Sequence, residues 1–174
     1  MSARSLKAKG FTLVEILIVV VILGILAAIV IPQFTSASEA AKASSLVTQL
    51  QSLRSQIELY QLQHNGNYPG VNDAGTGLVS SADFWADLTG TTDVDGKAAT
   101  TGQTYGPYLQ KEITNPFEDV NTIVADTEGE LDTGANTDVA FVYNPLTGEI
   151  KAVVATATAA KVNLDVADGD ILVY

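Results

Sequence analysis

The sequence has no cysteine and only one histidine, and both shortages narrow the chemistry open to the chain. Without cysteine, no disulfide can stabilise the fold and no thiolate can act as a nucleophile. A single histidine excludes zinc sites built from several histidine and cysteine ligands, so a metal would need carboxylate and carbonyl oxygens. Serine and threonine are abundant, but no set of nucleophile, base and orienting group stands out among them. The sequence therefore predicts no enzyme active site.

Basic residues are also scarce. The 174 residues include 9 Lys and Arg against 20 Asp and Glu, which gives a formal net charge of −11. Phosphate backbones attract Lys and Arg, so this balance argues against a nucleic-acid partner. The acidic stretch 118–138 contains no Lys or Arg at all. We expect it to form a solvated face, with binding of a cation or a basic partner as the alternative.

The apolar residues are concentrated near the N-terminus. From Phe11 to Ile31 the sequence is FTLVEILIVVVILGILAAIVI, in which Glu15 is the one charged residue. A helix of this length would span roughly 31 Å, about the hydrocarbon thickness of a bilayer. The basic residues 1–10 precede it, which places the N-terminus in the cytoplasm. A secretory signal peptide has a shorter apolar region, so we expect residues 11–32 to be retained as a transmembrane helix.

The helical pattern continues beyond Pro32, which we expect to kink the helix and not to end it. Apolar residues recur at helical spacing along one face of residues 33–64, and Asn65-Gly66 is a typical stop signal. His64 is expected to be a cap or a solvated residue at this end. The sequence thus predicts an amphipathic helix whose buried face consists of Leu46, Leu50, Leu53, Ile57 and Tyr60.

The remaining residues, 65–174, are expected to form the globular domain. A short helix over 82–88, capped by Ser81, would place Phe84 and Trp85 in the core.

Two strands, 139–143 and 149–155, flank the turn Asn144-Pro145-Leu146-Thr147-Gly148 and predict a hairpin, and 171–174 would add a third strand. The predicted fold class is α+β, in which the amphipathic helix packs on a small antiparallel sheet after a long loop region.

One short motif carries the strongest functional signal. The sequence Gly10-Phe11-Thr12-Leu13-Val14-Glu15, with a basic leader before it and an apolar helix after it, strongly resembles the processing site of type IV pilin-like proteins. The resemblance implies that a prepilin peptidase cuts between Gly10 and Phe11 on the cytoplasmic side of the membrane and methylates the new amino group of Phe11. Glycine at the cut position would let the backbone enter a narrow cleft.

Glu15 is the most informative single residue, because a carboxylate in the hydrocarbon zone costs about 2.5–3.5 kcal/mol and is expected to face a partner. The resemblance implies that it pairs with the amino group of Phe11 of an adjacent subunit. The alternative is a carboxylate that reaches the lipid headgroups. Gly24 and Pro32 are consistent with close helix packing and a tolerated kink. The resemblance adds that the segment between them loses helical hydrogen bonds when subunits pack into a filament.

The segments Tyr105–Leu109, Asn115–Phe117 and Tyr143–Pro145 look like those of the major pseudopilins of type II secretion. The implied function is a structural subunit that polymerises with copies of itself to drive protein export. The implied partners are the prepilin peptidase, an inner-membrane assembly platform and minor pseudopilins. The implied location is the bacterial inner membrane with a periplasmic C-terminal domain, and then a filament. The alternatives are a major type IV pilin of a surface pilus, a membrane-anchored protein that never polymerises, and an anchored enzyme.

Metal binding is the last candidate property. The same resemblance implies a structural calcium ion in the C-terminal loops, where Asp165, Asp168 and Asp170 are the candidate ligands. The segment Asp93-Val94-Asp95-Gly96 matches half of a calcium-loop pattern but lacks the rest of the loop, so we expect a solvated turn there.

Overall fold

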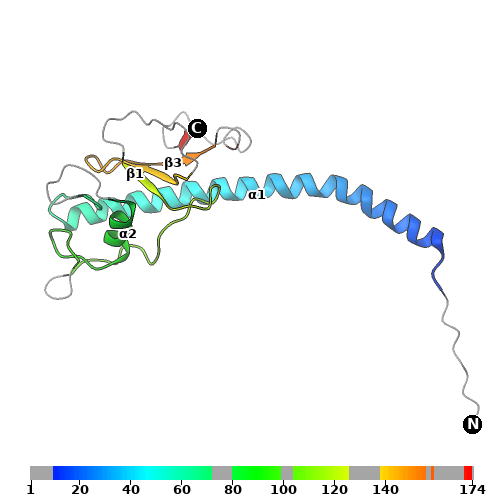
Figure 1. Ribbon diagram of the computed structural model, residues 1–174, viewed down its shortest axis with the longest axis horizontal. Coiled ribbons are helices and arrows are strands. Elements are labelled where there is room, and N and C mark those ends of the chain that lie inside the picture. The colour runs from blue at the N-terminus through cyan, green and yellow to red at the C-terminus, as the bar shows by residue number, and fades with distance from the viewer. Residues whose placement is uncertain are drawn as a thin grey trace, which may run out of the picture. The chain divides into compact units, whose positions relative to one another are not determined.

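A computed structural model of the chain describes residues 10–71, 80–98, 104–125, 138–155, 158 and 171–173. The chain divides into two compact units, Met1–Ser38 and Glu39–Tyr174. Helix α1 (Leu13–Gln63) contributes its first half to the former unit and its second half to the latter (Figure 1).

The helix α1 (Leu13–Gln63) passes through Pro32 as one element, as the sequence predicts. Proline has no backbone N–H, so the helix loses one hydrogen bond at this point. Two hydroxyls just beyond it form hydrogen bonds with the helix backbone. Thr35 Oγ1 donates to the carbonyl of Ile31 and Ser36 Oγ to the carbonyl of Pro32, each at 3.2 Å. These hydroxyls therefore need no partner outside the helix.

The end of α1 follows the predicted stop signal. Asn65 and Gly66 both have positive φ, at 55° and 89°. The amide of Gly66 donates to the carbonyl of Gln61 at 3.0 Å, a bond that closes the last helical turn. Asparagine and glycine are the residues that adopt this left-handed backbone most readily, which is why the helix ends here.

The second half of α1 supplies the core of the Glu39–Tyr174 unit. All five residues of the predicted apolar face are buried, with at most 2% of each exposed. They pack together with side chains from α2 and from the sheet, and Figure 1 shows the strands beside this part of the helix. The largest fully buried side chains of the unit include Trp85, Tyr60, Tyr143, Phe84 and Phe141.

Helix α2 (Ser81–Thr89) confirms the predicted short helix and its two aromatic core residues, Phe84 and Trp85. Its cap is Ser80 and not Ser81 as predicted: the Ser80 hydroxyl accepts a hydrogen bond from the amide of Asp83 at 3.1 Å. The hydroxyl of Ser81 instead accepts from the amide of Ile123 at 3.0 Å and so joins α2 to the sheet. A serine one residue further along thus has a tertiary role that local pattern alone does not reveal.

The sheet has four strands in the order β1-β2-β3-β4: β1 (Ile123–Ala125), β2 (Phe141–Tyr143), β3 (Ile150–Val154) and β4 (Ile171–Val173). The predicted hairpin is confirmed, because β2 and β3 are antiparallel. The prediction of a wholly antiparallel sheet is wrong, because β1 runs parallel to β2 and β4 runs parallel to β3. Long connections separate both parallel pairs in the sequence, which leaves room for the chain to return in the same direction.

Strand β1 (Ile123–Ala125) corrects a second prediction, since it lies inside the stretch 118–138 that we expected to be a solvated face. Ile123 is buried and belongs to the core. Residues 126–137 of this stretch lie outside the described part of the chain.

A buried asparagine fixes the loop before β1 to the sheet. Asn115 Nδ2 donates to the carbonyls of Ala140 and Val153 at 3.2 and 2.8 Å, and its Oδ1 accepts from the amide of Phe117 at 3.0 Å. These bonds satisfy the amide of a side chain that is fully buried. The segment Asn115-Pro116-Phe117 therefore has a clear structural function.

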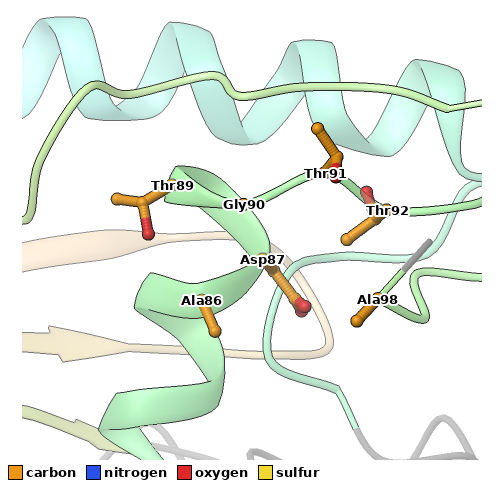
Figure 2. A pocket seen from close by; sticks show the side chains of 7 residues that line it. All are labelled: Ala86, Asp87, Thr89, Gly90, Thr91, Thr92 and Ala98. Carbon is orange, nitrogen blue, oxygen red and sulfur yellow. The ribbon is translucent and has the colours of Figure 1, made fainter. Parts of the chain in front are cut away.

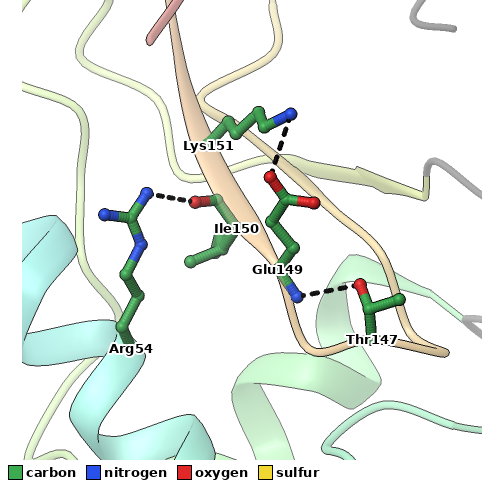
Figure 3. A network of polar contacts seen from close by, with 5 residues as sticks. All are labelled: Arg54, Thr147, Glu149, Ile150 and Lys151. Carbon is green, nitrogen blue, oxygen red and sulfur yellow. Dashed lines mark hydrogen bonds and ion pairs between the residues drawn. The ribbon is translucent and has the colours of Figure 1, made fainter. Parts of the chain in front are cut away.

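A second polar link joins α1 to β3 (Figure 3). The guanidinium of Arg54 donates to the carbonyl of Ile150 at 2.8 Å. Beside it, the Lys151 ammonium lies 3.0 Å from the carboxylate of Glu149, whose amide donates to Thr147 Oγ1 at 3.3 Å. The helix is thus fixed to the sheet by a charged group as well as by apolar packing.

His64 caps the end of α1, which is one of its two predicted roles, because its side chain bonds a carbonyl of the last helical turn. The other predicted role, a solvated residue, is wrong, because the side chain is fully buried. Its Nδ1 lies 2.8 Å from the carbonyl of Tyr60, and its Nε2 lies 2.8 Å from Thr92 Oγ1. The ring stacks on that of Tyr60 at 3.7 Å between centroids, and Tyr105 lies edge-on at 5.4 Å. A carbonyl only accepts, so Nδ1 carries a proton and a neutral ring accepts from Thr92.

The turn between β2 and β3 supports a prediction about stability. Gly148 has φ +74°, and a Cβ built there would lie 2.2 Å from the Tyr68 ring. Gly66 has φ +89° but nothing within 4 Å of such a Cβ. We expect Gly66→Ala to lower the free energy of unfolding by about 1–2 kcal/mol through backbone strain alone, and Gly148→Ala to lower it further. Urea unfolding of the full chain in detergent micelles, followed by the fluorescence of Trp85, measures both. Equal losses would show that the Tyr68 ring moves aside freely.

Candidate functional site

The start of α1 is closed by two residues of the processing-site motif. Thr12 Oγ1 accepts from the amide of Glu15 at 3.2 Å, and Glu15 Oε2 accepts from the amide of Thr12 at 2.8 Å. Glu15 Oε2 also accepts from the Thr12 hydroxyl at 2.9 Å. This reciprocal arrangement is a capping box, in which the side chains at the helix start satisfy each other's backbone amides.

The capping box explains how Glu15 is held before any neighbour is present. Residues 10–38 contain no Lys or Arg, so no side-chain cation of this segment can neutralise the carboxylate. It receives two hydrogen bonds from Thr12 instead and lies in the first turn, where the helix dipole favours a negative charge. Glu15 is otherwise exposed, so the carboxylate stays accessible to a partner.

Sequence reasoning predicted Glu15 but missed Thr12. A detectable signal was present, because Thr12-Leu13-Val14-Glu15 has the pattern of Ser or Thr followed three residues later by Glu at a helix start. The structure brings this threonine and the predicted glutamate together.

Gly10 and Phe11 lie just before α1, and both are exposed. The Phe11 side chain is 80% exposed. A Cβ at Gly10 would meet nothing within 4 Å. Among the described residues, no contact requires glycine at this position.

The first half of α1 exposes an apolar surface all round. Within the described residues, α1 is the one helix long and apolar enough to cross a membrane, as judged by length and composition. Gly24 lies in this surface, and a Cβ there would meet nothing within 4 Å. It leaves room for a neighbouring helix to approach closely. The large exposed side chains of the segment are Leu13, Val14, Ile16, Leu17, Ile18, Val19, Val20, Val21, Ile22, Leu23, Ile25, Leu26, Ile29, Val30 and Ile31.

The structure describes one of the two segments that the sequence offers as metal-binding candidates. Asp165, Asp168 and Asp170 lie outside the described residues. The segment Asp93-Val94-Asp95-Gly96 forms the expected turn, in which Asp93 Oδ1 accepts from the amides of Asp95 and Lys97 at 3.0 and 2.9 Å. Among the described residues, no group of three or more His, Cys, Asp or Glu is placed to hold a metal ion.

Comparison with known proteins finds a family motif in the N-terminal segment. Residues 5–31 match the family model described as the prokaryotic N-terminal methylation motif. No solved structure matches the chain.

Several curated proteins are similar to the chain over fewer than half of its residues. Type II secretion system core protein G of Pectobacterium carotovorum subsp. carotovorum is 38% identical over 74 residues, which are 42% of this chain and 47% of that protein. The protein of that name from Escherichia coli strain K12 is 36% identical over 75 residues, 43% of this chain and 51% of that protein. A fimbrial protein of Neisseria meningitidis serogroup B is 36% identical over 76 residues, 44% of each chain.

The chain thus spans about half the length of the curated relatives it matches. The matched motif covers the capping box and most of the exposed apolar segment of α1. The chain therefore carries the N-terminal methylation motif of prepilin-type proteins and is similar to proteins named Type II secretion system core protein G.

Proposed function

We propose that this chain is a structural subunit of a type II secretion pseudopilus, which polymerises through its N-terminal helix to drive protein export. The observation that carries the proposal is the exposed apolar segment of α1 joined to an accessible carboxylate, Glu15, inside a methylation motif. A surface of this size without polar groups requires lipid or other helices around it. The similarity to core protein G supports the secretion system as the setting.

The proposed sequence of events begins in the bacterial inner membrane. A prepilin peptidase cuts between Gly10 and Phe11 and methylates the new N-terminus. The subunit then waits with its C-terminal domain in the periplasm. An assembly platform, together with minor pseudopilins, transfers it into the filament, where Glu15 pairs with the amino group of Phe11 of a neighbour. The apolar segments, with Gly24 and Pro32 among their contacts, pack against each other in the filament core.

A second candidate function is the major subunit of a surface pilus, and the similarity to a fimbrial protein favours it. Both functions use the same helix. They differ in whether the filament stays in the periplasm or extends beyond the cell surface. A filament confined to the periplasm supports the pseudopilus, and a filament extending from the cell surface supports the pilus. Structural calcium, with Asp165, Asp168 and Asp170 as ligands, stays a proposal for either case.

Processing is the step that tests the proposal directly. We expect the protein isolated from its native membrane to begin at N-methylated Phe11, as measured by mass spectrometry of the N-terminal peptide. A Gly10→Val variant is the control: its β-branched side chain should block the peptidase and leave the leader in place. A parent protein that retains Met1 and stays monomeric would favour an anchored protein that never polymerises.

A further inference from the structure

The turn that ends α1 contains the one asparagine of the sequence that directly precedes a glycine, Asn65 before Gly66. Both residues are exposed, and both have positive φ. A Cβ built at Gly66 would meet nothing within 4 Å, so the space beside this residue is open. Solvent water therefore has access to the peptide bond that joins the two residues.

An asparagine in this setting can lose its side-chain amide without an enzyme, which is one reason why asparagine is thermolabile. The backbone nitrogen of the next residue gives up its proton and attacks the side-chain carbonyl carbon. A new C–N bond closes a cyclic imide, and the side-chain nitrogen leaves as ammonia with the electron pair of the broken bond. Water then opens the imide at either carbonyl and leaves aspartate or isoaspartate. Glycine favours the attack, because no side chain shields its nitrogen.

Two backbone hydrogen bonds flank Asn65 and control when the attack can occur. The amide of Gly66 donates to the carbonyl of Gln61 at 3.0 Å, and the amide of Asn67 donates to the carbonyl of His64 at 2.9 Å. The attacking nitrogen must lose its proton, so the bond to Gln61 has to open first. Helix ends fray readily, and the reaction proceeds during such openings.

His64 limits this opening to the exposed residues 65–67. Its Nε2 lies 2.8 Å from Thr92 Oγ1, and Figure 2 shows Thr92 on the segment that follows α2. Its ring is fully buried and stacks on the ring of Tyr60. The reaction therefore needs a local opening of the turn and not unfolding of the whole unit.

We propose that Asn65 is a site of spontaneous deamidation, which adds one negative charge at the C-terminal end of α1. The last turn of the helix has no basic residue that could pair with the new carboxylate. The helix dipole places partial negative charge at this end, so a carboxylate here weakens the helix. Isoaspartate also adds one carbon atom to the backbone between the two flanking hydrogen bonds, whose donors and acceptors then no longer align.

The test incubates the full chain in detergent micelles at mildly alkaline pH and digests it at acidic pH, where the imide forms slowly. Tandem mass spectrometry then locates each asparagine that has become a carboxylate. Asn115 and Asn144 are internal controls, because each precedes a proline, whose nitrogen has no proton to give up. Asn65→Gln is the matched variant, since its longer side chain would have to close a larger ring. A synthetic peptide of residues 61–70 gives the rate without the fold.

We expect Asn65 to become a mixture of aspartate and isoaspartate, more slowly in the folded chain than in the peptide. We expect Asn115, Asn144 and the glutamine of Asn65→Gln to stay unchanged. An Asn65 that remains intact after the peptide has converted fully would overturn the proposal. Conversion of Asn115 or Asn144 at the same rate would overturn it as well, because direct hydrolysis would then explain the loss.

The effect on the helix is measured with Asn65→Asp, which carries the charge of the product without the additional backbone carbon. We expect this variant to reduce the equilibrium constant for folding about two- to fivefold, in line with a carboxylate at the negative end of a helix. Deamidated chains separated by ion exchange should be at least as unstable as the variant. An Asn65→Asp chain as stable as the parent would refute the destabilising effect.

Discussion

Glu15→Gln is expected to lower the yield of assembled filament at least tenfold while leaving membrane insertion unchanged. Glutamine can retain the capping box with Thr12, because Gln serves at this position as Glu does. It carries no charge, so it cannot form an ion pair with the amino group of a neighbouring Phe11. Removing one partner of a desolvated charge pair costs about 2–5 kcal/mol. Because about 1.4 kcal/mol corresponds to a factor of ten, the expected loss is large.

The glutamine variant separates two roles that alanine would remove together. If Glu15 acts mainly as a helix cap, Glu15→Gln should assemble like the parent, and Thr12→Ala should be as defective as Glu15→Ala. If the charge is what matters, both Glu15 variants should fail, and Thr12→Ala should assemble better than either. Filament yield in sheared or fractionated cells, normalised to membrane-inserted subunit, distinguishes these results. Parent-like assembly of Glu15→Gln would remove the charge-pairing argument.

Trp85→Ala is expected to lower the free energy of unfolding by about 3–5 kcal/mol, as for other fully buried aromatic residues cut back to alanine. Trp85 is 1% exposed, its ring lies edge-on to Phe84 at 5.2 Å, and its Nε1 donates to the carbonyl of Asn121 at 2.8 Å. The variant thus loses packing between α2 and the sheet and leaves a carbonyl without its donor.

Two further variants show how much of the loss of stability comes from the hydrogen bond and how much a substitution at the surface costs. Trp85→Phe retains most of the ring and loses the hydrogen bond to Asn121, so we expect a smaller loss of about 1–2 kcal/mol. Leu62→Ala changes a side chain that is 81% exposed and should stay within about 0.5 kcal/mol of the parent. Because Trp85 is the sole tryptophan, urea unfolding is followed by circular dichroism. A Trp85→Ala loss below about 1 kcal/mol would mean that the core of this unit closes around the missing ring.

The features that sequence predicted well are those set by local periodicity. The buried face from Leu46 to Tyr60 follows from helical spacing alone, because residues three and four apart share one face. The hairpin of β2 and β3 follows from the turn at Asn144–Gly148 between two apolar runs. Both signals lie within a few residues of the elements they specify.

The features that sequence missed depend on distant partners. His64 is buried because Thr92, 28 positions away, provides a hydrogen-bond partner for its second nitrogen. Strand β1 is three residues long and pairs in parallel with β2, so neither its length nor its neighbours in the sequence mark it. Ser81 resembles a helix cap but bonds to Ile123 of the sheet. Such contacts become visible only when the chain is folded.

The capping box of Thr12 and Glu15 satisfies the backbone amides of both residues at the start of α1 without any partner from another subunit. A subunit with this capping box has two hydrogen bonds to its carboxylate before it meets any neighbour. Under the proposed pairing, joining a filament exchanges one set of partners for another instead of rescuing a bare charge. The free energy released at this end of the helix is then the difference between two satisfied states. If this difference is small, we expect the filament to grow only while the assembly machinery adds subunits. We expect it to dissociate into single subunits when that machinery stops.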